Sequence, residues 1–362
     1  MLKICSLLSR QVVSCGSKRY QPLKLSAFLS SVTMGPKLKI GTHNGTFHCD
    51  EVLACTMLKY AKDEFKNAEV VRTRNMDILN ECDVVVDVGG VYEPSAHRYD
   101  HHQKSFSETM NSLSNNYPWT IKLSSAGLVY YHFGHQIISR ILNLAADSEE
   151  VKVIFNKLYE NLIQEVDAID NGIDACKTTD VVYKVHTHLS ARIKHLNPPW
   201  NEKNQDETKC FKKACELAEQ EFLDRVNFYG KIWLPAREIV KEAIKNRHSV
   251  HPSGEIMEFE NGGCPWKEHL YDLETSMKIE PPIKFVIYTD TNGLWRVQCV
   301  SVSLFSFENR VSLHEDWRGL RDEELSKVSG IDGCTFVHMS GFIGGCKTRE
   351  GAINMALKSL GI

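Results

Sequence analysis

Val84-Val85-Val86-Asp87-Val88-Gly89-Gly90 is the stretch that decides the fold. Its valines make a strand apolar on both faces, which is typical of a parallel strand buried between layers of helices. Gly89-Gly90 can end the strand by a sharp turn. Asp87 then lies alone at the carboxyl end of a buried strand, which makes it a candidate functional residue.

Strands and helices alternate around this stretch. Leu38 and Ile40 alternate with polar residues and predict a short strand that ends before His43. A helix is predicted to begin at Asp50-Glu51, because acidic side chains suit the positive end of the helix dipole. Further elements are a strand at Val70-Val71 and helices at 126–144, capped by Ser124-Ser125, and at 151–169. The alternation predicts an α/β fold with a mostly parallel sheet.

The domain boundaries follow from a break after residue 195. His195-Leu196-Asn197-Pro198-Pro199-Trp200 interrupts the pattern, and we interpret it as the end of the first domain or as a lid. Two strongly charged helices are predicted after it, at about 206–227 and 235–247. A second unit has strands at 283–289 and 295–301 and a final helix at 350–360. We therefore expect a first domain at 36–195, a linker with connecting helices at 196–248, and a smaller α/β domain at 249–362.

Composition narrows the class of protein. Hydrophobic residues make up 42% of the 362 residues and no apolar run is long enough to cross a membrane. The net charge of −3 argues against an avid, sequence-blind nucleic-acid binder, which would carry a basic surface. The twelve cysteines include no Cys-x-x-Cys pair, so neither a zinc ribbon nor a disulfide framework is expected.

The first 35 residues differ from the rest of the chain. They contain Lys and Arg but no acid, and the first acidic residue of the chain is Asp50. A Ser-rich, basic, acid-free start predicts a mitochondrial transit peptide and hence the mitochondrial matrix, the alternative being a disordered basic tail.

Imidazoles and carboxylates follow three predicted strands. Because the carboxyl ends of parallel strands meet at one edge of a sheet, we expect these side chains to lie together. Two divalent ions roughly 3.5–4 Å apart need a bridging carboxylate and terminal His and Asp ligands. Asp87 is the candidate bridge, with His43 and His48 at one ion and Asp50, His101 and a later aspartate at the other.

The later aspartate has two candidates in Asp167-Ala168-Ile169-Asp170-Asn171-Gly172. We expect Asp170, where a helix ends before a turn, and Asp167 is the alternative. A mixed nitrogen and oxygen ligand set suits Mn²⁺ best, with Mg²⁺ as a second choice.

These blocks resemble a known family. The order His-x4-His-x-Asp, a strand-ending Asp, Asp100-His101-His102 and a later Asp resembles the DHH phosphoesterase superfamily. The blocks at 41–51, 87–90, 97–103, 124–127, 167–172, 317–320 and 336–345 are similar to those of one branch, the melanocyte-proliferating-gene family of eukaryotes. The resemblance covers nearly everything from Lys37 to the C-terminus. Where His48 stands, the superfamily usually has an aspartate, so we expect weaker binding or a different metal preference at that ion.

The resemblance implies a 3′–5′ exoribonuclease that acts on RNA in mitochondria and also in the nucleus or nucleolus. His102 is expected to contact the phosphate or assist the leaving oxygen. Asp100 is expected to orient a histidine. No obligate protein partner is inferred.

The C-terminal unit is expected to close on the substrate, as in DHH-type proteins. A glycine-rich loop at 341–345 would let backbone N–H groups approach phosphate. The expected substrate-binding residues are Arg310, His338, Gly344, Gly345 and Lys347. The alternative is a glycine-rich turn between a strand and a helix, with the cations on a solvated edge.

Two other functions fit the same residues. The metal ligands alone do not distinguish an exonuclease from a pyrophosphatase or small nucleotide phosphatase. A non-enzymatic, metal-stabilised RNA-binding scaffold is the third possibility. It does not explain why so many ionisable groups, which are costly to bury, are expected at one place.

Overall fold

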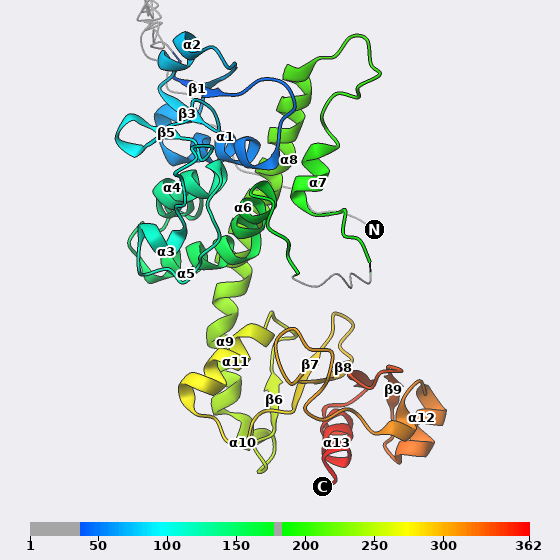
Figure 1. Cartoon of the computed structure of the whole chain (residues 1–362). Helices are drawn as coiled ribbons and strands as arrows, with labels where there is room; N and C mark the ends of the chain where they lie inside the picture. The colour runs from blue at the N-terminus through cyan, green and yellow to red at the C-terminus, as the bar shows by residue number, and fades with distance from the viewer. Residues whose placement is uncertain (1–36, 177–182) are drawn as a thin grey trace, which may run out of the picture. The chain divides into compact units, whose positions relative to one another are not determined.

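The computed structural model describes residues 37–176 and 183–362 (Figure 1). The predicted transit segment lies outside the described residues. No helix in the described part has the length and apolar character that crossing a bilayer requires.

A mostly parallel sheet forms the first half of the chain, as predicted. Its strands are β1 (Lys39–Thr42), β2 (Glu69–Arg72), β3 (Val84–Val86), β4 (Tyr92–Glu93) and β5 (Arg98–Tyr99). Their order is β2-β1-β3-β5-β4, and β4 alone runs antiparallel, against β5. The three central strands therefore end side by side. His43, Asp87 and Asp100 follow these ends directly along the sequence.

Helices cover this sheet and complete its core. They are α1 (Cys49–Ala61), α2 (Met76–Asn80), α3 (Met110–Leu113), α4 (Ser125–Leu142), α5 (Glu149–Leu158), α6 (Gln164–Asp170) and α7 (Leu189–Lys194), with 3-10 turns η1 (Asp63–Phe65) and η2 (Pro94–Ala96). The π-helical turn η3 (Tyr159–Ile163) joins α5 to α6, so the helix predicted at 151–169 is continuous. Helix α1 is buried along most of its length between the sheet, α4 and α8.

The charged helices predicted after residue 205 form one helical run. It comprises α8 (Glu207–Asn227), the π-helical turn η4 (Phe228–Trp233) and α9 (Leu234–Lys245). Helix α8 lies in the segment 196–248, which was predicted to be a linker with connecting helices. Its apolar face, with Phe211, Ala218 and Phe222, is buried in the same core as α1 and α4. The many charged residues on the opposite face make this apolar pattern hard to recognise in the sequence.

A second five-stranded sheet forms the C-terminal half. Its strands are β6 (Ile256–Phe259), β7 (Phe285–Thr289), β8 (Trp295–Cys299), β9 (Cys334–Val337) and β10 (Ile343–Cys346), in the order β6-β7-β8-β10-β9. Only β6 and β7 are parallel. The accompanying helices are α10 (Arg247–Val250), α11 (Lys267–Met277), η5 (Glu315–Trp317), α12 (Asp322–Ser329) and α13 (Arg349–Leu360). The chain is thus α/β in both halves.

Candidate metal centre

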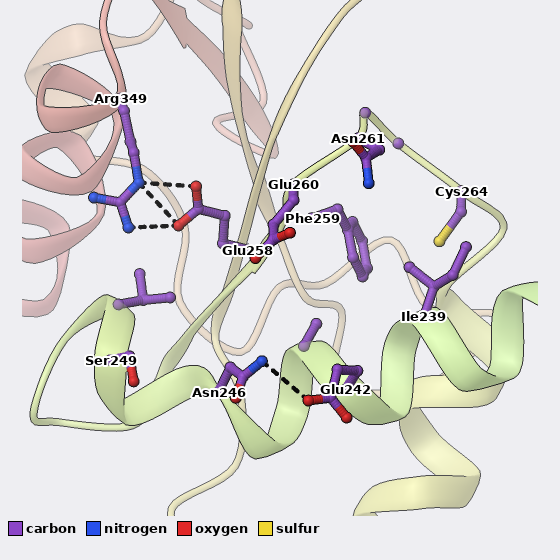
Figure 2. Close-up of a pocket in the computed structure, with 14 residues that line it drawn as sticks. Ile239, Glu242, Asn246, Ser249, Glu258, Phe259, Glu260, Asn261, Cys264 and Arg349 are labelled. Atoms are coloured by element: carbon purple, nitrogen blue, oxygen red, sulfur yellow. Dashed lines mark hydrogen bonds and ion pairs between the residues drawn. The ribbon is translucent and has the colours of Figure 1, made fainter.

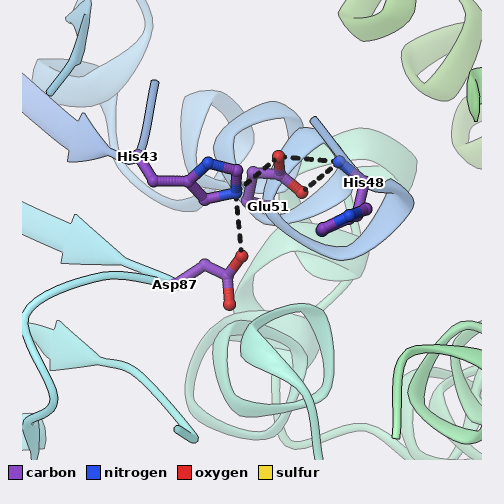
Figure 3. A group of neighbouring side chains, drawn as sticks. All are labelled: His43, His48, Glu51 and Asp87. Atoms are coloured by element: carbon purple, nitrogen blue, oxygen red, sulfur yellow. Dashed lines mark hydrogen bonds and ion pairs between the residues drawn. The ribbon is translucent and has the colours of Figure 1, made fainter. Parts of the chain in front are cut away.

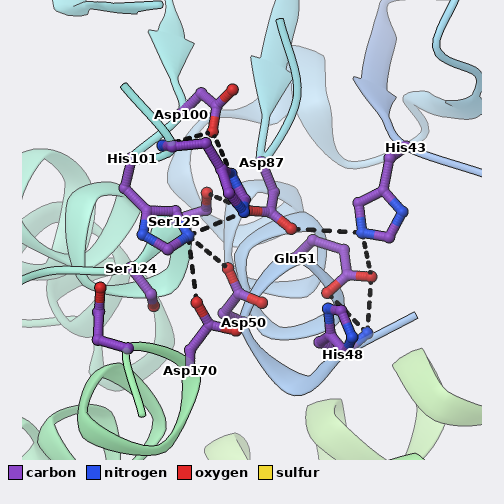
Figure 4. A network of polar contacts seen from close by, with 12 residues as sticks. His43, His48, Asp50, Glu51, Asp87, Asp100, His101, Ser124, Ser125 and Asp170 are labelled. Carbon is purple, nitrogen blue, oxygen red and sulfur yellow. Dashed lines mark hydrogen bonds and ion pairs between the residues drawn. The ribbon is translucent and has the colours of Figure 1, made fainter. Parts of the chain in front are cut away.

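Asp87 lies at the centre of a cluster of imidazoles and carboxylates (Figure 4). Its Oδ2 atom is 3.3 Å from His43 Nε2, and its Oδ1 atom is 3.2 Å from His101 Nε2. Each carboxylate oxygen therefore faces a different histidine. The backbone of Asp87 is left-handed, with φ of 59°, and this turn directly after β3 sets the direction of the side chain.

Four side chains form the first group of possible metal ligands: His43, His48, Glu51 and Asp87 (Figure 3). One ligand atom from each lies within 4.8 Å of the others. His43 Nε2 is 3.1 Å from Glu51 Oε1, and the Glu51 side chain is fully buried. Glu51 was not among the predicted ligands, because an acid in the first turn of a helix has an ordinary explanation in the helix dipole.

Two further groups lie on the other side of Asp87. One contains Asp87, His101 and His102, and the other contains His48, Asp50 and Asp170. His101 Nε2 joins them, since it lies 3.1 Å from Asp170 Oδ2 and 3.9 Å from Asp50 Oδ2. The structure thus brings all six predicted metal ligands together.

Unpartnered polar atoms at this place fit a bound cation. Both carboxylate oxygens of Asp50 and both ring nitrogens of His101 are buried and accept or donate no hydrogen bond. His101 Nε2 is close to two carboxylates, yet the geometry is not that of a hydrogen bond. Leaving such groups without partners is costly, and divalent ions are the natural partners for this donor set. Within residues 37–176 and 183–362, no Lys or Arg forms an ion pair with these carboxylates.

The protonation of the metal-free cluster shows the same need for positive charge. Burial lowers the pKa of His43, but Asp87 and Glu51 outweigh it and raise the pKa to about 10. Burial likewise lowers the pKa of His101, and Asp170 and Asp87 raise it to about 9. Burial and the neighbouring charges of Asp87 and Asp170 raise the pKa of Asp50 well above its ordinary value. Protons therefore supply charge that a metal ion would otherwise provide.

His102 and Asp100 form a pair at the edge of the cluster. His102 Nδ1 is 2.7 Å from Asp100 Oδ1, and Asp100 Oδ2 accepts a hydrogen bond of 2.6 Å from the backbone N–H of Gly90. The bond to Asp100 raises the pKa of His102, whose side chain is 62% exposed. Asp100 therefore fixes the tautomer and orientation of a histidine that faces solvent.

Asp167, the alternative last ligand, does not face the cluster. Its Oδ1 atom accepts hydrogen bonds from Ser124 N (2.9 Å), Ser124 Oγ (2.7 Å) and Gly127 N (3.1 Å). Its Oδ2 atom accepts one from the Tyr159 hydroxyl (3.2 Å). Asp167 thus accepts hydrogen bonds from backbone N–H groups at the start of α4. This capping role was predicted for the side chains of Ser124-Ser125. Asp170 is the aspartate beside His101.

Ser125 has a different partner from the one expected. Its hydroxyl lies 3.2 Å from Asp87 Oδ1 and 3.0 Å from the carbonyl oxygen of Tyr99. It therefore helps to hold the central carboxylate rather than the end of a helix. A serine at a predicted helix start gives no sequence signal for this role.

The predicted substrate residues of the C-terminal half are placed differently from expectation. Gly344 and Gly345 lie in strand β10 and pair with β8 and β9, so they do not form a phosphate-binding loop. Side chains pack where their Cβ atoms would be, with Leu313 Cδ1 at 2.9 Å for Gly344 and Arg296 Nη1 at 2.5 Å for Gly345. Close packing therefore requires these glycines.

The cations predicted to bind substrate differ in availability. Arg310 is committed to a partly buried pair with Glu274, with N–O distances of 2.8 and 2.7 Å, and also donates to the carbonyl of Ile283. His338 is exposed, and its Nδ1 atom is 2.9 Å from Ser340 Oγ in the turn before β10. Lys347 is exposed just after β10. Arg310 therefore has structural partners already, and its role in substrate binding stays a prediction.

A pocket of about 650 Å³ lies between α9, α10 and β6 (Figure 2). Its walls are partly apolar, and its pair Glu258–Arg349 is internally satisfied, with Arg349 Nε 2.8 and 3.0 Å from the two carboxylate oxygens. None of the predicted site residues lines it. The cluster around Asp87 is therefore the better candidate for chemistry.

Comparisons with known proteins agree on one family. The model of the MYG1 exonuclease family, described as an uncharacterised protein family (UPF0160), matches residues 39–360. MYG1 exonuclease of Bos taurus is 54% identical over 340 residues, which are 94% of this chain and 89% of that protein. MYG1 exonuclease of Homo sapiens is 55% identical over 322 residues, 89% of this chain and 85% of that protein. The MYG1 protein of Saccharomyces cerevisiae is 42% identical over 330 residues, 89% and 95% of the two chains.

Among solved structures, the chain has a distant likeness to RecJ from Thermus thermophilus, crystallised in complex with Mn²⁺. The identity is 12%, the match covers 90% of this chain and 52% of that one, and the TM-score is 0.25. The matches to the family model and to the relatives confirm the predicted resemblance to the melanocyte-proliferating-gene family. The chain belongs to the MYG1 exonuclease family.

Proposed function

We propose that this protein is a metal-dependent 3′–5′ exoribonuclease with two divalent ions, preferably Mn²⁺, at the cluster around Asp87. The observation that carries the proposal is the placement of Asp87, with one carboxylate oxygen facing His43 and the other facing His101. A shared carboxylate of this kind is what a two-metal phosphodiesterase requires. The names of the relatives support a nuclease, whereas RNA as the substrate and the 3′–5′ polarity rest on the family resemblance of the sequence.

The chemistry divides between ions and side chains. Divalent ions in such a site provide a nucleophile derived from water at neutral pH and neutralise charge on the phosphate. His43, His48 and Glu51 would hold one ion, and Asp50, His101 and Asp170 the other, with Asp87 shared. Ser125 restrains Asp87 through its hydroxyl.

His102 is suited to protonate the leaving oxygen. Its Nδ1 atom is bonded to Asp100, so Nε2 is the nitrogen free to meet the substrate. The raised pKa keeps more of the imidazole protonated near neutral pH, and a protonated Nε2 can donate to the oxygen that departs from phosphorus. Asp100 stabilises this cation and keeps the ring oriented.

The test compares the protein with Asp87→Asn, using Mn²⁺ and RNA labelled at the 3′ or the 5′ end, DNA and pyrophosphate as substrates. Asp83→Asn is the matched control, because Asp83 is an exposed aspartate that precedes the same strand. We expect stepwise shortening of RNA from the 3′ end that Asp87→Asn abolishes and Asp83→Asn retains. Release of phosphate from pyrophosphate alone would replace the proposal with a pyrophosphatase. Absence of activity from the unchanged protein on every substrate would support a non-enzymatic scaffold, and equal activity of Asp87→Asn would contradict the role of Asp87.

For localisation we propose the mitochondrial matrix, with a nuclear or nucleolar fraction as in the family. The mitochondrial proposal rests on the basic, acid-free composition of residues 1–35, and the nuclear one rests on the family resemblance alone. A fluorescent fusion of the whole chain should enter mitochondria, and the same fusion without residues 1–35 should not. Mitochondrial import of the shortened fusion would contradict it.

A further inference from the structure

The loop that carries His43 and His48 is held from outside by residues far away in the sequence. Arg72, at the end of β2, donates from Nε to the carbonyl of His43 at 3.2 Å and from Nη2 to the carbonyl of Gly45 at 2.6 Å. Glu207, at the start of α8, accepts from the N–H of Gly45 at 3.2 Å. The first half of the loop is therefore fixed by two charged side chains.

Asn197 fixes the second half. Its Oδ1 atom accepts from the N–H of Phe47 and its Nδ2 atom donates to the carbonyl of Phe47, both at 2.9 Å. Nδ2 also donates to the carbonyl of Lys194 at 3.2 Å, at the end of α7. The Asn197 amide thus pairs with both backbone groups of Phe47, as a neighbouring strand would. It links Phe47 to α7, whose residue Ile193 is buried in the core.

His48 follows Phe47 directly, so its backbone is held on both sides. The ring of Phe47 is fully buried and packs edge-on against Phe211 at 5.6 Å between centroids. The N–H of His48 donates to both carboxylate oxygens of Glu51, at 2.8 and 3.0 Å. The His48 side chain is exposed and its ring contacts that of His43 at 5.9 Å between centroids, so the backbone contacts help to place it in its two ligand groups.

We infer that Asn197 is a positioning residue of the metal centre, acting through Phe47 on His48. The segment between α7 and α8, interpreted from the sequence as the end of a domain or a lid, is then part of the machinery that sets metal affinity. The inference rests on the proposed metal centre and is independent of the substrate. It concerns residue 48, where the superfamily usually has an aspartate.

The experiment measures Mn²⁺ binding to Asn197→Ala by calorimetry, together with the electron paramagnetic resonance spectrum of the bound Mn²⁺. Asn227→Ala is the matched control, because Asn227 also donates from its side chain to one backbone carbonyl, that of Leu223 in α8. Loss of a group that orients a metal ligand typically weakens binding by about 10- to 100-fold. We expect that loss, with a changed spectrum, for Asn197→Ala and neither effect for the control.

A double-mutant cycle separates positioning from general destabilisation. If Asn197 acts through His48, then Asn197→Ala should add little further loss of Mn²⁺ affinity in a His48→Ala background. Fully additive losses would overturn the inference, as would unchanged Mn²⁺ affinity of Asn197→Ala. Asp87→Asn is measured in parallel. If Asp87→Asn also leaves Mn²⁺ binding unchanged, the metal centre itself is wrong; if it abolishes binding while Asn197→Ala does not affect it, only the role of Asn197 fails.

Discussion

Alanine replacements of Asp167 and Asp170 should have opposite consequences, although the two residues lie one helical turn apart in α6. Asp167→Ala removes the acceptor of four hydrogen bonds from Ser124, Gly127 and Tyr159 in a fully buried place. A buried donor left unsatisfied costs about 1–3 kcal/mol, and loss of a helix cap costs about 1 kcal/mol. Because water can replace part of the network, we expect a loss of about 3–5 kcal/mol of unfolding free energy.

Asp170→Ala should lower the metal-free stability much less than Asp167→Ala does, because relief of repulsion offsets the lost pairing with His101. Its side chain is 16% exposed and its close partner is His101, at 3.1 Å. It also lies among other carboxylates, so its removal relieves repulsion around Asp50. We expect Mn²⁺ affinity to fall at least about tenfold, as for the loss of one ligand.

The assay is chemical denaturation of the metal-free proteins together with Mn²⁺ calorimetry. The account expects Asp167→Ala to be destabilised with Mn²⁺ affinity retained under conditions where it is folded, and Asp170→Ala to show the reverse. If Asp167→Ala loses Mn²⁺ binding while it remains folded, or if Asp170→Ala binds Mn²⁺ as tightly as the unchanged protein, the assignment of the last ligand is refuted.

Further predictions concern metal binding at His48, the pH dependence of stability and of Mn²⁺ affinity, and the stability of the C-terminal half. His48→Asp should tighten Mn²⁺ binding or change its selectivity in competitive titrations, since it adds a negative charge to one ion's ligands; identical affinity and selectivity would dismiss this idea. With folded pKa values of about 10 for His43 and about 9 for His101, against 6.5 when unfolded, the stabilisation that their protonation gives the metal-free protein is complete below pH 6.5 and is lost as the pH rises toward 9–10. Mn²⁺ affinity should rise over the same range with release of protons, and calorimetry in buffers of different ionisation enthalpy that detects no proton release would contradict this. Gly344→Ala should destabilise the protein by about 1–3 kcal/mol through overpacking against Leu313 and Met355, with Mn²⁺ affinity unaltered. Arg310→Ala should cost about 3–5 kcal/mol by leaving Glu274 unpaired, and replacing both by apolar residues should restore much of the loss; no restoration would point to a role beyond this pair.

Much of the metal centre was predictable because strand ends and their polar residues are local features. The valine run before Asp87 predicts a buried strand, and the adjacency of β1, β3 and β5 then brings His43, Asp87 and His101 to one edge. Glu51 was missed because the same residue suits a helix start. What distinguishes it is that its carboxylate folds back to the N–H of His48 and toward His43, which depends on the conformation of the loop.

The C-terminal half was harder to predict because Gly344 and Gly345 are required by contacts with residues that are distant in the sequence. Two successive glycines favour a loop in sequence, but β10 lies between β8 and β9 in the sheet. β9 precedes it directly along the chain, whereas β8 comes from a part of the chain more distant in sequence. The pairing of Arg310 with Glu274 is likewise invisible along the sequence, since 36 residues separate them. Helix α8 shows the same limit, because burial of one face against α1 outweighs its charged composition.

Anomalous diffraction from crystals grown with Mn²⁺ tests the central claim most directly. The account predicts two Mn²⁺ peaks, roughly 3.5–4 Å apart, with one oxygen of Asp87 bound to each. It also predicts His43 at one peak and His101 at the other. A single peak, or two peaks of which neither is bound by Asp87, would contradict it.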